Sequence, residues 1–136
     1  SNNKNEIYSI DARSGIVRWQ QTVSSSIRPI IVENLVFSIS EHGFLFVIDD
    51  KTGNIIRVTN VFENIKNDKN MIKPSGFVIA RNKIYLSLNN GKLIKIENSF
   101  GRQEMIYKIG NTKISRPYVF NQNMYLIKEN GIIKSN

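Results

Sequence analysis

The chain of 136 residues is long enough for one domain with a hydrophobic core. It contains no cysteine, which excludes disulfides and thiolate metal sites, and no apolar run approaches the ~20 residues of a membrane-spanning helix. The formal net charge of +8 fits either an anionic partner or a compositional bias, because Lys, Asn and Ile are all abundant and the basic residues are scattered.

The first predicted elements are two short strands, Glu6–Asp11 and Ile16–Thr22, joined by a tight turn. Ile, Val and aromatic residues are plentiful and helical periodicity is missing, which favours strands over helices. Asp11 ends the first strand, and its carboxylate can accept hydrogen bonds from amides of the turn. Gly15 supplies a positive φ there at no steric cost.

Two complete four-stranded units and one partial unit are expected to follow, over Arg28–Asn60, Ser75–Ile109 and 115–134. In the first of them Val36–Ser40 is expected to pair with Phe44–Asp49. In the second, Ile84–Leu88 is expected to pair with Lys92–Glu97, because Asn-Gly between alternating apolar runs indicates a hairpin. The partial unit is expected to contain the strands Ser115–Phe120, Asn123–Lys128 and Ile132–Lys134.

A polar segment from Asn60 to Lys73 lengthens the connection between the two complete units. Loops of this kind carry function in some proteins and accumulate sequence drift in others, and both interpretations stay open. The apolar residues inside this segment have a spacing that allows one short helical turn: Val61, Phe62, Ile65 and Ile72.

Three features recur in the same order along the chain, as expected for a repeat of roughly 40–50 residues. An acid lies four residues before a glycine in three pairs: Asp11 and Gly15, Asp49 and Gly53, Glu97 and Gly101. A tight turn precedes an apolar strand three times: His42-Gly43, Asn90-Gly91 and Asn130-Gly131. A basic residue and a proline open a strand three times: Arg28-Pro29, Lys73-Pro74 and Arg116-Pro117.

The run Asp49-Asp50-Lys51-Thr52-Gly53 and the strand Ile16-Val17-Arg18-Trp19 resemble the repeat of quinoprotein (PQQ)-like β-propellers. In that repeat an apolar strand ends in Asp, an x-x-Thr-Gly turn follows, and the next strand ends in tryptophan. Trp19 stands at the family's docking-tryptophan position, whereas Arg57 and Met105 occupy it in the other units. The resemblance implies an all-β fold, a partial β-propeller of four-stranded antiparallel blades in an open arc of about three blades.

An open arc of this kind has consequences for assembly. Each blade of a propeller buries its faces against its neighbours, so an arc leaves apolar faces uncovered. We therefore expect residues 1–136 to be a single fragment of a longer propeller, beginning at the third strand of a blade. Association of two arcs into a homodimer is the other expectation.

Within this family the chain resembles BamB-type outer-membrane assembly lipoproteins. That resemblance implies a scaffold, not an enzyme, which binds protein partners in the periplasm and reaches the outer membrane only through the parent protein. Two alternatives stay open: a fragment of a PQQ-dependent dehydrogenase-like propeller, and a ligand-sensing propeller domain. The dehydrogenases use a quinone with calcium and typically carry an adjacent cysteine pair, so a chain without cysteine favours the scaffold and no cofactor.

The basic residues before the three prolines are the candidate partner-binding residues: Arg28, Lys73 and Arg116. The first strand of each propeller blade lines the central channel, so these residues would form part of a positive ring that attracts an acidic protein segment. The alternative is that they are exposed residues that keep strand starts polar. Addition of a partner's β-strand to an exposed sheet edge is a second binding mode. Nucleic acid is not expected, because most aromatic residues alternate into core positions.

No catalytic or metal-ligating residue is predicted from the sequence. His42 is the one histidine, and we expect it to be an exposed turn residue. The acids recur at one position of each repeat, which favours turn chemistry over catalysis. The predicted structural residues of the repeat are Asp11, Gly15, Trp19, Asp49, Gly53, Glu97 and Gly101.

Overall fold

The computed structural model describes residues 5–23, 25, 27–63, 65, 72–128 and 131–135, the last range by its backbone. In these residues strands are the regular structure, and no helix is long and apolar enough to cross a membrane. The strands are β1 (Glu6–Ile10), β2 (Val17–Thr22), β3 (Ile30–Val32), β4 (Leu35–Ile39), β5 (Phe44–Asp49), β6 (Ile55–Asn60), β7 (Pro74–Ala80), β8 (Lys83–Leu88), β9 (Lys92–Glu97), β10 (Arg102–Lys108), β11 (Tyr118–Phe120), β12 (Asn123–Lys128) and β13 (Gly131–Ser135).

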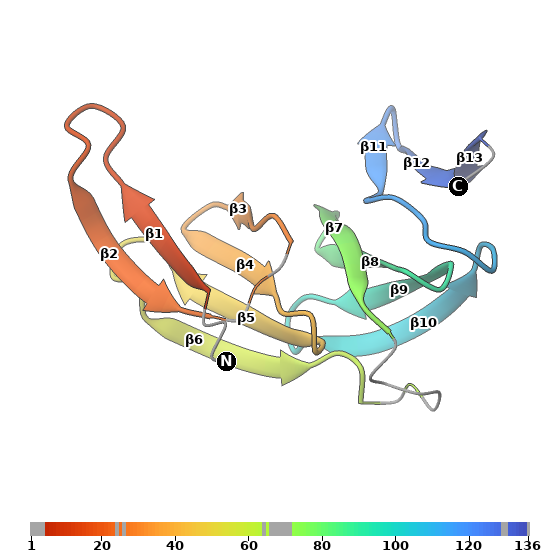
Figure 1. Ribbon diagram of the computed structural model, residues 1–136, viewed down its shortest axis with the longest axis horizontal. Coiled ribbons are helices and arrows are strands. Elements are labelled where there is room, and N and C mark those ends of the chain that lie inside the picture. Colours follow the sequence, from red (N-terminus) through yellow and green to blue (C-terminus); the bar gives the residue numbers. More distant parts are fainter. Residues whose placement is uncertain are drawn as a thin grey trace.

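The strands form four antiparallel sheets in chain order. These are β1-β2, β3-β4-β5-β6, β7-β8-β9-β10 and β11-β12-β13, and within each sheet every strand pairs with the next one along the chain. Figure 1 shows the sheets following one another in an open arc, with β3, β7 and β11 on its concave side and β6 and β10 on its convex side. The all-β fold of open, four-stranded antiparallel sheets predicted from the sequence is confirmed.

The predicted hairpin pairings are also confirmed, with ends shifted by one residue. In β4, Phe37 lies opposite Val47 of β5, and in β8, Tyr85 lies opposite Lys95 of β9. The third expected turn includes Asn130, which lies outside the described residues. Each basic-proline pair directly precedes or enters an inner strand, since proline tolerates the first strand position, where no ladder amide is needed.

Three apolar clusters lie between consecutive sheets. We call these contacts the first, second and third junctions, in chain order. The first contains Trp19, Val36 and Ile48, and the third contains Leu93, Ile114 and Leu126. The second is the largest, and its buried side chains include: Phe37, Ile39, Leu45, Val47, Phe77, Ile84, Leu86, Leu88, Ile94 and Ile96. Burial of apolar area between neighbouring sheets therefore holds the arc together.

The polar segment after β6 contributes apolar residues to the second junction. Val61, Phe62, Ile65 and Ile72 are all buried there. The Phe62 ring lies so close to Gly43 that an added Cβ would be 2.3 Å from it. The Ile65 amide donates to the Phe62 carbonyl at 3.1 Å and closes a turn. The rest of the expected helical turn, residues 64 and 66–71, lies outside the described residues.

Candidate functional site

The first junction is closed by Trp19, which projects from β2 onto the β5–β6 turn of the next sheet. Its side chain is only 9% exposed, and its indole Nε1 donates to the Asp50 carbonyl at 2.5 Å. Gly53 lies under the ring, and an added Cβ would stand 2.6 Å from Trp19 Cδ2. Gln21 donates from Nε2 to the Gly53 carbonyl at 2.8 Å. An aromatic ring, a hydrogen bond and a glycine thus interlock two sheets.

The recurring acids lie in the turns that connect the two outer strands of the first three sheets. Asp11 accepts hydrogen bonds from the Arg13 and Ser14 amides at 2.8 and 3.1 Å. Asp49 accepts from the Lys51 amide at 2.7 Å and the Thr52 amide at 3.3 Å. The Ser14 and Arg13 amides stabilise the charged form and hold the pKa of Asp11 below its ordinary value.

Glu97 occupies the same turn position in the third sheet. It accepts hydrogen bonds from the Ser99 amide and, at 3.2 Å, from the Phe100 amide. Partial desolvation opposes ionisation, but these hydrogen bonds outweigh it, so the pKa of Glu97 is lowered. Gly101 ends this turn, where an added Cβ would lie 2.7 Å from Thr59 Oγ1 of the preceding sheet.

Arg57 takes the place of tryptophan at the second junction. Trp19 lies opposite Ser9, Arg57 opposite Val47 and Met105 opposite Lys95, which is one register position in three sheets. The Arg57 guanidinium donates through Nη2 to the Asn98 carbonyl at 2.7 Å and through Nη1 to the Ser99 carbonyl. Sequence reasoning recorded Arg57 only as a departure from the motif and missed this contact, although its repeat position located it.

Met105 does not interlock with a following sheet. Its side chain is 50% exposed. The third junction is closed elsewhere, where Ser75 Oγ donates to the Ile114 carbonyl at 2.6 Å, and where Gly91 lies so close to Gly110 that an added Cβ would stand 2.3 Å from the Gly110 carbonyl oxygen.

The three candidate basic residues lie at the starts of the inner strands and differ in environment. Arg28 and Lys73 are exposed. Arg116 is half-buried: its Cβ would lie 2.5 Å from a Cβ added at Gly76, and its guanidinium stands 5.6 Å from the Tyr118 ring centroid. Arg28 and Lys73 therefore present their charges to solvent, whereas Arg116 is also part of the packing between β7 and β11.

The histidine and the acidic residues in the part of the chain that the structure describes do not form a metal site. His42 is exposed in the β4–β5 turn, 3.8 Å from the exposed Glu41 carboxylate. No group of three or more His, Cys, Asp or Glu side chains in these described residues is arranged to hold a metal ion.

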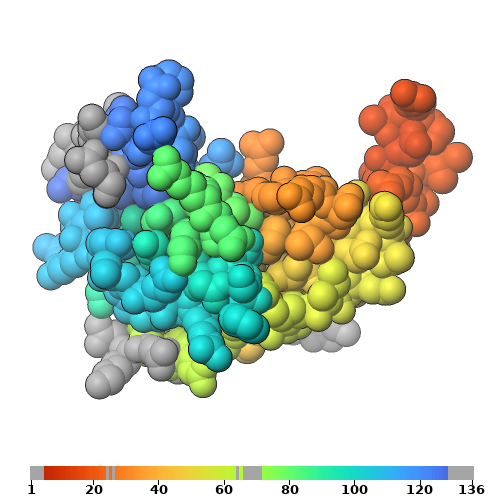
Figure 2. Space-filling view, turned by 180° about the vertical axis from the view of Figure 1, so that it is seen from behind, coloured from red at the N-terminus to blue at the C-terminus, as the bar shows by residue number. Residues whose placement is uncertain are grey.

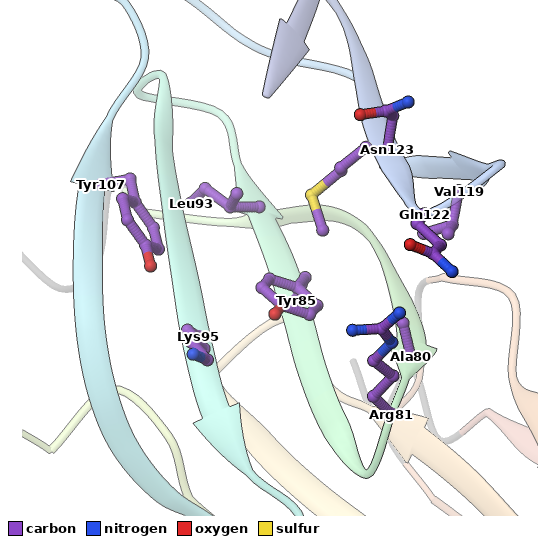
Figure 3. A pocket seen from close by; sticks show the side chains of 10 residues that line it. Ala80, Arg81, Tyr85, Leu93, Lys95, Tyr107, Val119, Gln122 and Asn123 are labelled. Atoms are coloured by element: carbon purple, nitrogen blue, oxygen red, sulfur yellow. The ribbon is translucent and has the colours of Figure 1, made fainter. Parts of the chain in front are cut away.

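A cavity of about 400 Å³ opens at the third junction, between the β7–β10 sheet and the β11–β12 hairpin (Figure 3). Its apolar wall includes Leu93, Met124 and Val119, and Tyr85 lies near its centre. Its remaining lining residues are Ala80, Arg81, Lys95, Tyr107, Gln122 and Asn123. The motifs did not indicate this cavity, because it arises from the meeting of two sheets.

Two side chains at the cavity come from turns with an unusual backbone. Arg81 has φ +50° and Gln122 has φ +66°, in the left-handed region that glycine and asparagine favour. A residue with a long side chain held there costs about 1–3 kcal/mol. In Figure 3 both side chains lie at one side of the cavity.

The cavity also has an uneven charge. Glu104 is shared by Lys83 and by Lys95, whose Nζ lies 3.7 Å from the carboxylate. The hydrogen bond from Lys83 lowers the pKa of Glu104 and raises that of Lys83. Glu97 also faces Lys83, so with Arg81 three cations stand against two carboxylates. One positive charge remains without a matching carboxylate in this group.

The geometry defines the chain as a propeller-type protein: consecutive antiparallel sheets of up to four strands, with apolar clusters between them, in an open arc. Comparison with protein families places it more narrowly. Residues 1–123 match the family model described as "Outer membrane protein assembly factor BamB", and the chain belongs to this family. The quinoprotein-like, BamB-type resemblance inferred from the repeat is thereby confirmed. A comparison with curated proteins finds no match.

Solved structures show the same fold at low sequence identity. BamB from Moraxella catarrhalis is 20% identical, with a TM-score of 0.61 over 89% of this chain and 40% of that chain. Saccharomyces cerevisiae Sqt1 is 14% identical, with a TM-score of 0.78 over 96% of this chain and 40% of that one. A europium-containing methanol dehydrogenase is 12% identical, with a TM-score of 0.58 over 74% of this chain and 21% of that one. The chain thus spans about two fifths, or less, of these proteins.

Proposed function

We propose that this protein is a non-catalytic scaffold that binds other proteins during outer-membrane β-barrel assembly, in the periplasm at the outer membrane. One observation carries the proposal: the inner strands β3 and β11 leave large apolar side chains uncovered. Ile31 is 64% exposed and Phe120 is 67% exposed, with Val119 and Tyr118 beside Phe120. Uncovered apolar side chains of this size are typical of protein-binding surfaces.

Charge supports a particular kind of partner. Arg28 precedes β3 and Lys73 precedes β7, and both are exposed at the starts of inner strands. The chain carries a net charge of +8. A partner segment that combines acidic and apolar residues would match both features, since complementary charge steers association and apolar contacts supply affinity.

Site-specific photocrosslinking in the native host tests the proposal. A photoreactive residue is placed at Ile31 or Phe120 of the full-length protein, and at Ile56 as a control, because Ile56 is similarly exposed but lies on the convex strand β6. We expect the inner positions to crosslink to β-barrel assembly proteins and Ile56 not to. Equal crosslinking at all three positions, or none to such proteins, contradicts the proposal.

Neutralisation of the basic residues tests the charge component. The variant R28Q/K73Q/R116Q is expected to weaken binding of the crosslinked partner, with a reduced dependence on salt. Because Arg116 also packs on Gly76, the variant R28Q/K73Q provides the same comparison without that packing change. Unchanged affinity in both variants would exclude a role for these charges.

Self-association is a second form of protein binding that the structure makes testable. The tip of the β1–β2 hairpin stands clear of the body in Figure 2, and the hairpin exposes Tyr8, Ile10 and Val17. At the other end of the arc Ile127 is also exposed. Light scattering over a range of concentrations is expected to show a dimer, and a constant monomer mass would rule it out.

A further inference from the structure

We propose that the cavity at the third junction is a binding site for a carboxylate attached to an aromatic or aliphatic group. The carboxylate meets Arg81 at the cavity's edge, and the apolar group lies against Leu93, Val119 and Met124. The cavity volume of about 400 Å³ is within the usual range of ligand sites. This inference is independent of the proposed scaffold role.

The repeat itself supplies the comparison that supports a polar occupant. At the second junction Phe37 lies opposite Val47, and both are buried and apolar. At the same register in the next sheet Tyr85 lies opposite Lys95, and both line the cavity. A cavity lies beside both pairs, about 290 Å³ at the second junction and about 400 Å³ at the third, but the apolar pair that lines the first of these cavities is replaced by a hydroxyl and a cation in the other.

The hairpin turns at the edge of the cavity place two of its polar side chains. Arg81 and Gln122 hold left-handed conformations that glycine would adopt more easily, and both side chains line the cavity. Asn121 has the same φ of +50° as Arg81 but does not line it. Glu33 has a φ of +56° at the same turn position in the preceding sheet, so the left-handed backbone belongs to the turn, and in the third sheet this turn places the Arg81 side chain beside the cavity.

The charge determines the class of ligand. Arg81, Lys83 and Lys95 stand against Glu97 and Glu104, and within the described residues no carboxylate pairs with Arg81. A single carboxylate on the ligand would balance the group. Guanidinium binds carboxylates through two parallel hydrogen bonds, and the Gln122 and Asn123 amides lie close enough to the cavity to add donors.

NMR titration of the whole ¹⁵N-labelled chain tests the site with three probes. N-acetylphenylalanine represents the carboxy terminus of a polypeptide, 3-phenylpropionate represents a free small acid, and N-acetylphenylalaninamide lacks the charge. We expect saturable shifts at the amides of 81–85 and 122–124 with the two acids and not with the amide. Tighter binding of N-acetylphenylalanine would identify the carboxy terminus of a polypeptide as the ligand. Equal or tighter binding of 3-phenylpropionate would identify a free small acid as the ligand.

Two variants separate binding from structure. R81G relieves the backbone conformation and removes the charge, so we expect an unchanged or higher midpoint of unfolding and at least about tenfold weaker binding of the acid. N121G relieves the same conformation outside the cavity and should bind as the wild type does. Val47 occupies the position of Lys95 in the preceding sheet, so K95V places valine at both positions. This variant should also weaken binding of the acid while the fold is kept.

Three outcomes would overturn the proposal. The first is no saturable shift at these amides up to millimolar acid. The second is equal binding of the acid and the amide, which would remove the carboxylate from the interaction. The third is wild-type affinity in both R81G and K95V.

Discussion

At the first junction the side chain in the docking position, Trp19, is buried against the next sheet, whereas at the third junction Met105 in the same register is half exposed. The contact at the second junction is intermediate, because Arg57 reaches the turn of the next sheet through hydrogen bonds to two carbonyls. The repeat therefore fixes where consecutive sheets can interlock but not the chemistry of the contact. A cavity lies at each of the two later junctions, about 290 Å³ beside Arg57 at the second and about 400 Å³ at the third, where the walls are more polar.

Removal of the Trp19 ring should have the largest effect on stability. W19A loses the buried ring and its hydrogen bond to Asp50, and we expect the free energy of unfolding to fall by about 3–5 kcal/mol. Urea unfolding followed by circular dichroism measures this, because the variant has no tryptophan fluorescence. A loss below about 1 kcal/mol, the size of an ordinary substitution, would mean that the ring does not hold the junction.

The glycine under the ring should come next, and Gly15 provides a matched control. Both have positive φ, +77° at Gly53 and +74° at Gly15, so alanine costs about 1–2 kcal/mol at each. Only Gly53 contacts the Trp19 ring, whereas nothing lies within 4 Å of a Cβ at Gly15. G53A should therefore lose about 1–3 kcal/mol more than G15A in urea unfolding. Equal losses would show that the close approach is unimportant.

Truncation of Arg57 should have an intermediate effect. R57A removes hydrogen bonds from a charged group to two carbonyls, and we expect a loss of about 1.5–3 kcal/mol in the same assay. R18A is the control, because Arg18 contacts Asp50 only at 4.0 Å and on the surface, where such pairs contribute about 0–1 kcal/mol. Equal effects of the two variants would contradict an interlocking role for Arg57.

The charge cluster beside the cavity should have the smallest effect, visible as a dependence on pH. Lys83 lowers the folded-state pKa of Glu104 below its ordinary value of 4.5. The ionised Glu104 therefore stabilises the fold fully above pH 4.5, and this stabilisation is lost as the pH falls through the lowered pKa. Urea unfolding of E104Q should therefore vary less with pH below 4.5 than that of the wild type. Parallel pH profiles would show that the pairs with Lys83 and Lys95 are not coupled to folding.

The all-β fold and the family could be predicted because they depend on local patterns that repeat. Asp49 and Gly53 specify a turn by themselves, and Trp19 completes a recognisable motif. The contact of Arg57 could not be predicted, since it requires the position of a turn in the following sheet. The burial of Phe62 was hidden by polar neighbours, although it packs against Gly43.

The cavity could not be predicted for a related reason. Tyr85 and Lys95 look ordinary in strands with one polar face, and only the packing of the β11–β12 hairpin beside their sheet encloses them in a cavity. The positions of Arg81 and Gln122 at the cavity could not be predicted either, because the left-handed backbone that places them is a property of the folded hairpin.

Hydrogen exchange of the W19A variant beside the wild type tests most directly whether one side chain interlocks consecutive sheets. We expect faster exchange confined to β1, β2 and the strands of the first junction, with β8, β9 and β12 unchanged, because the second and third junctions do not contain Trp19. Faster exchange spread evenly over all four sheets, or none in β1 and β2, would contradict the interlock.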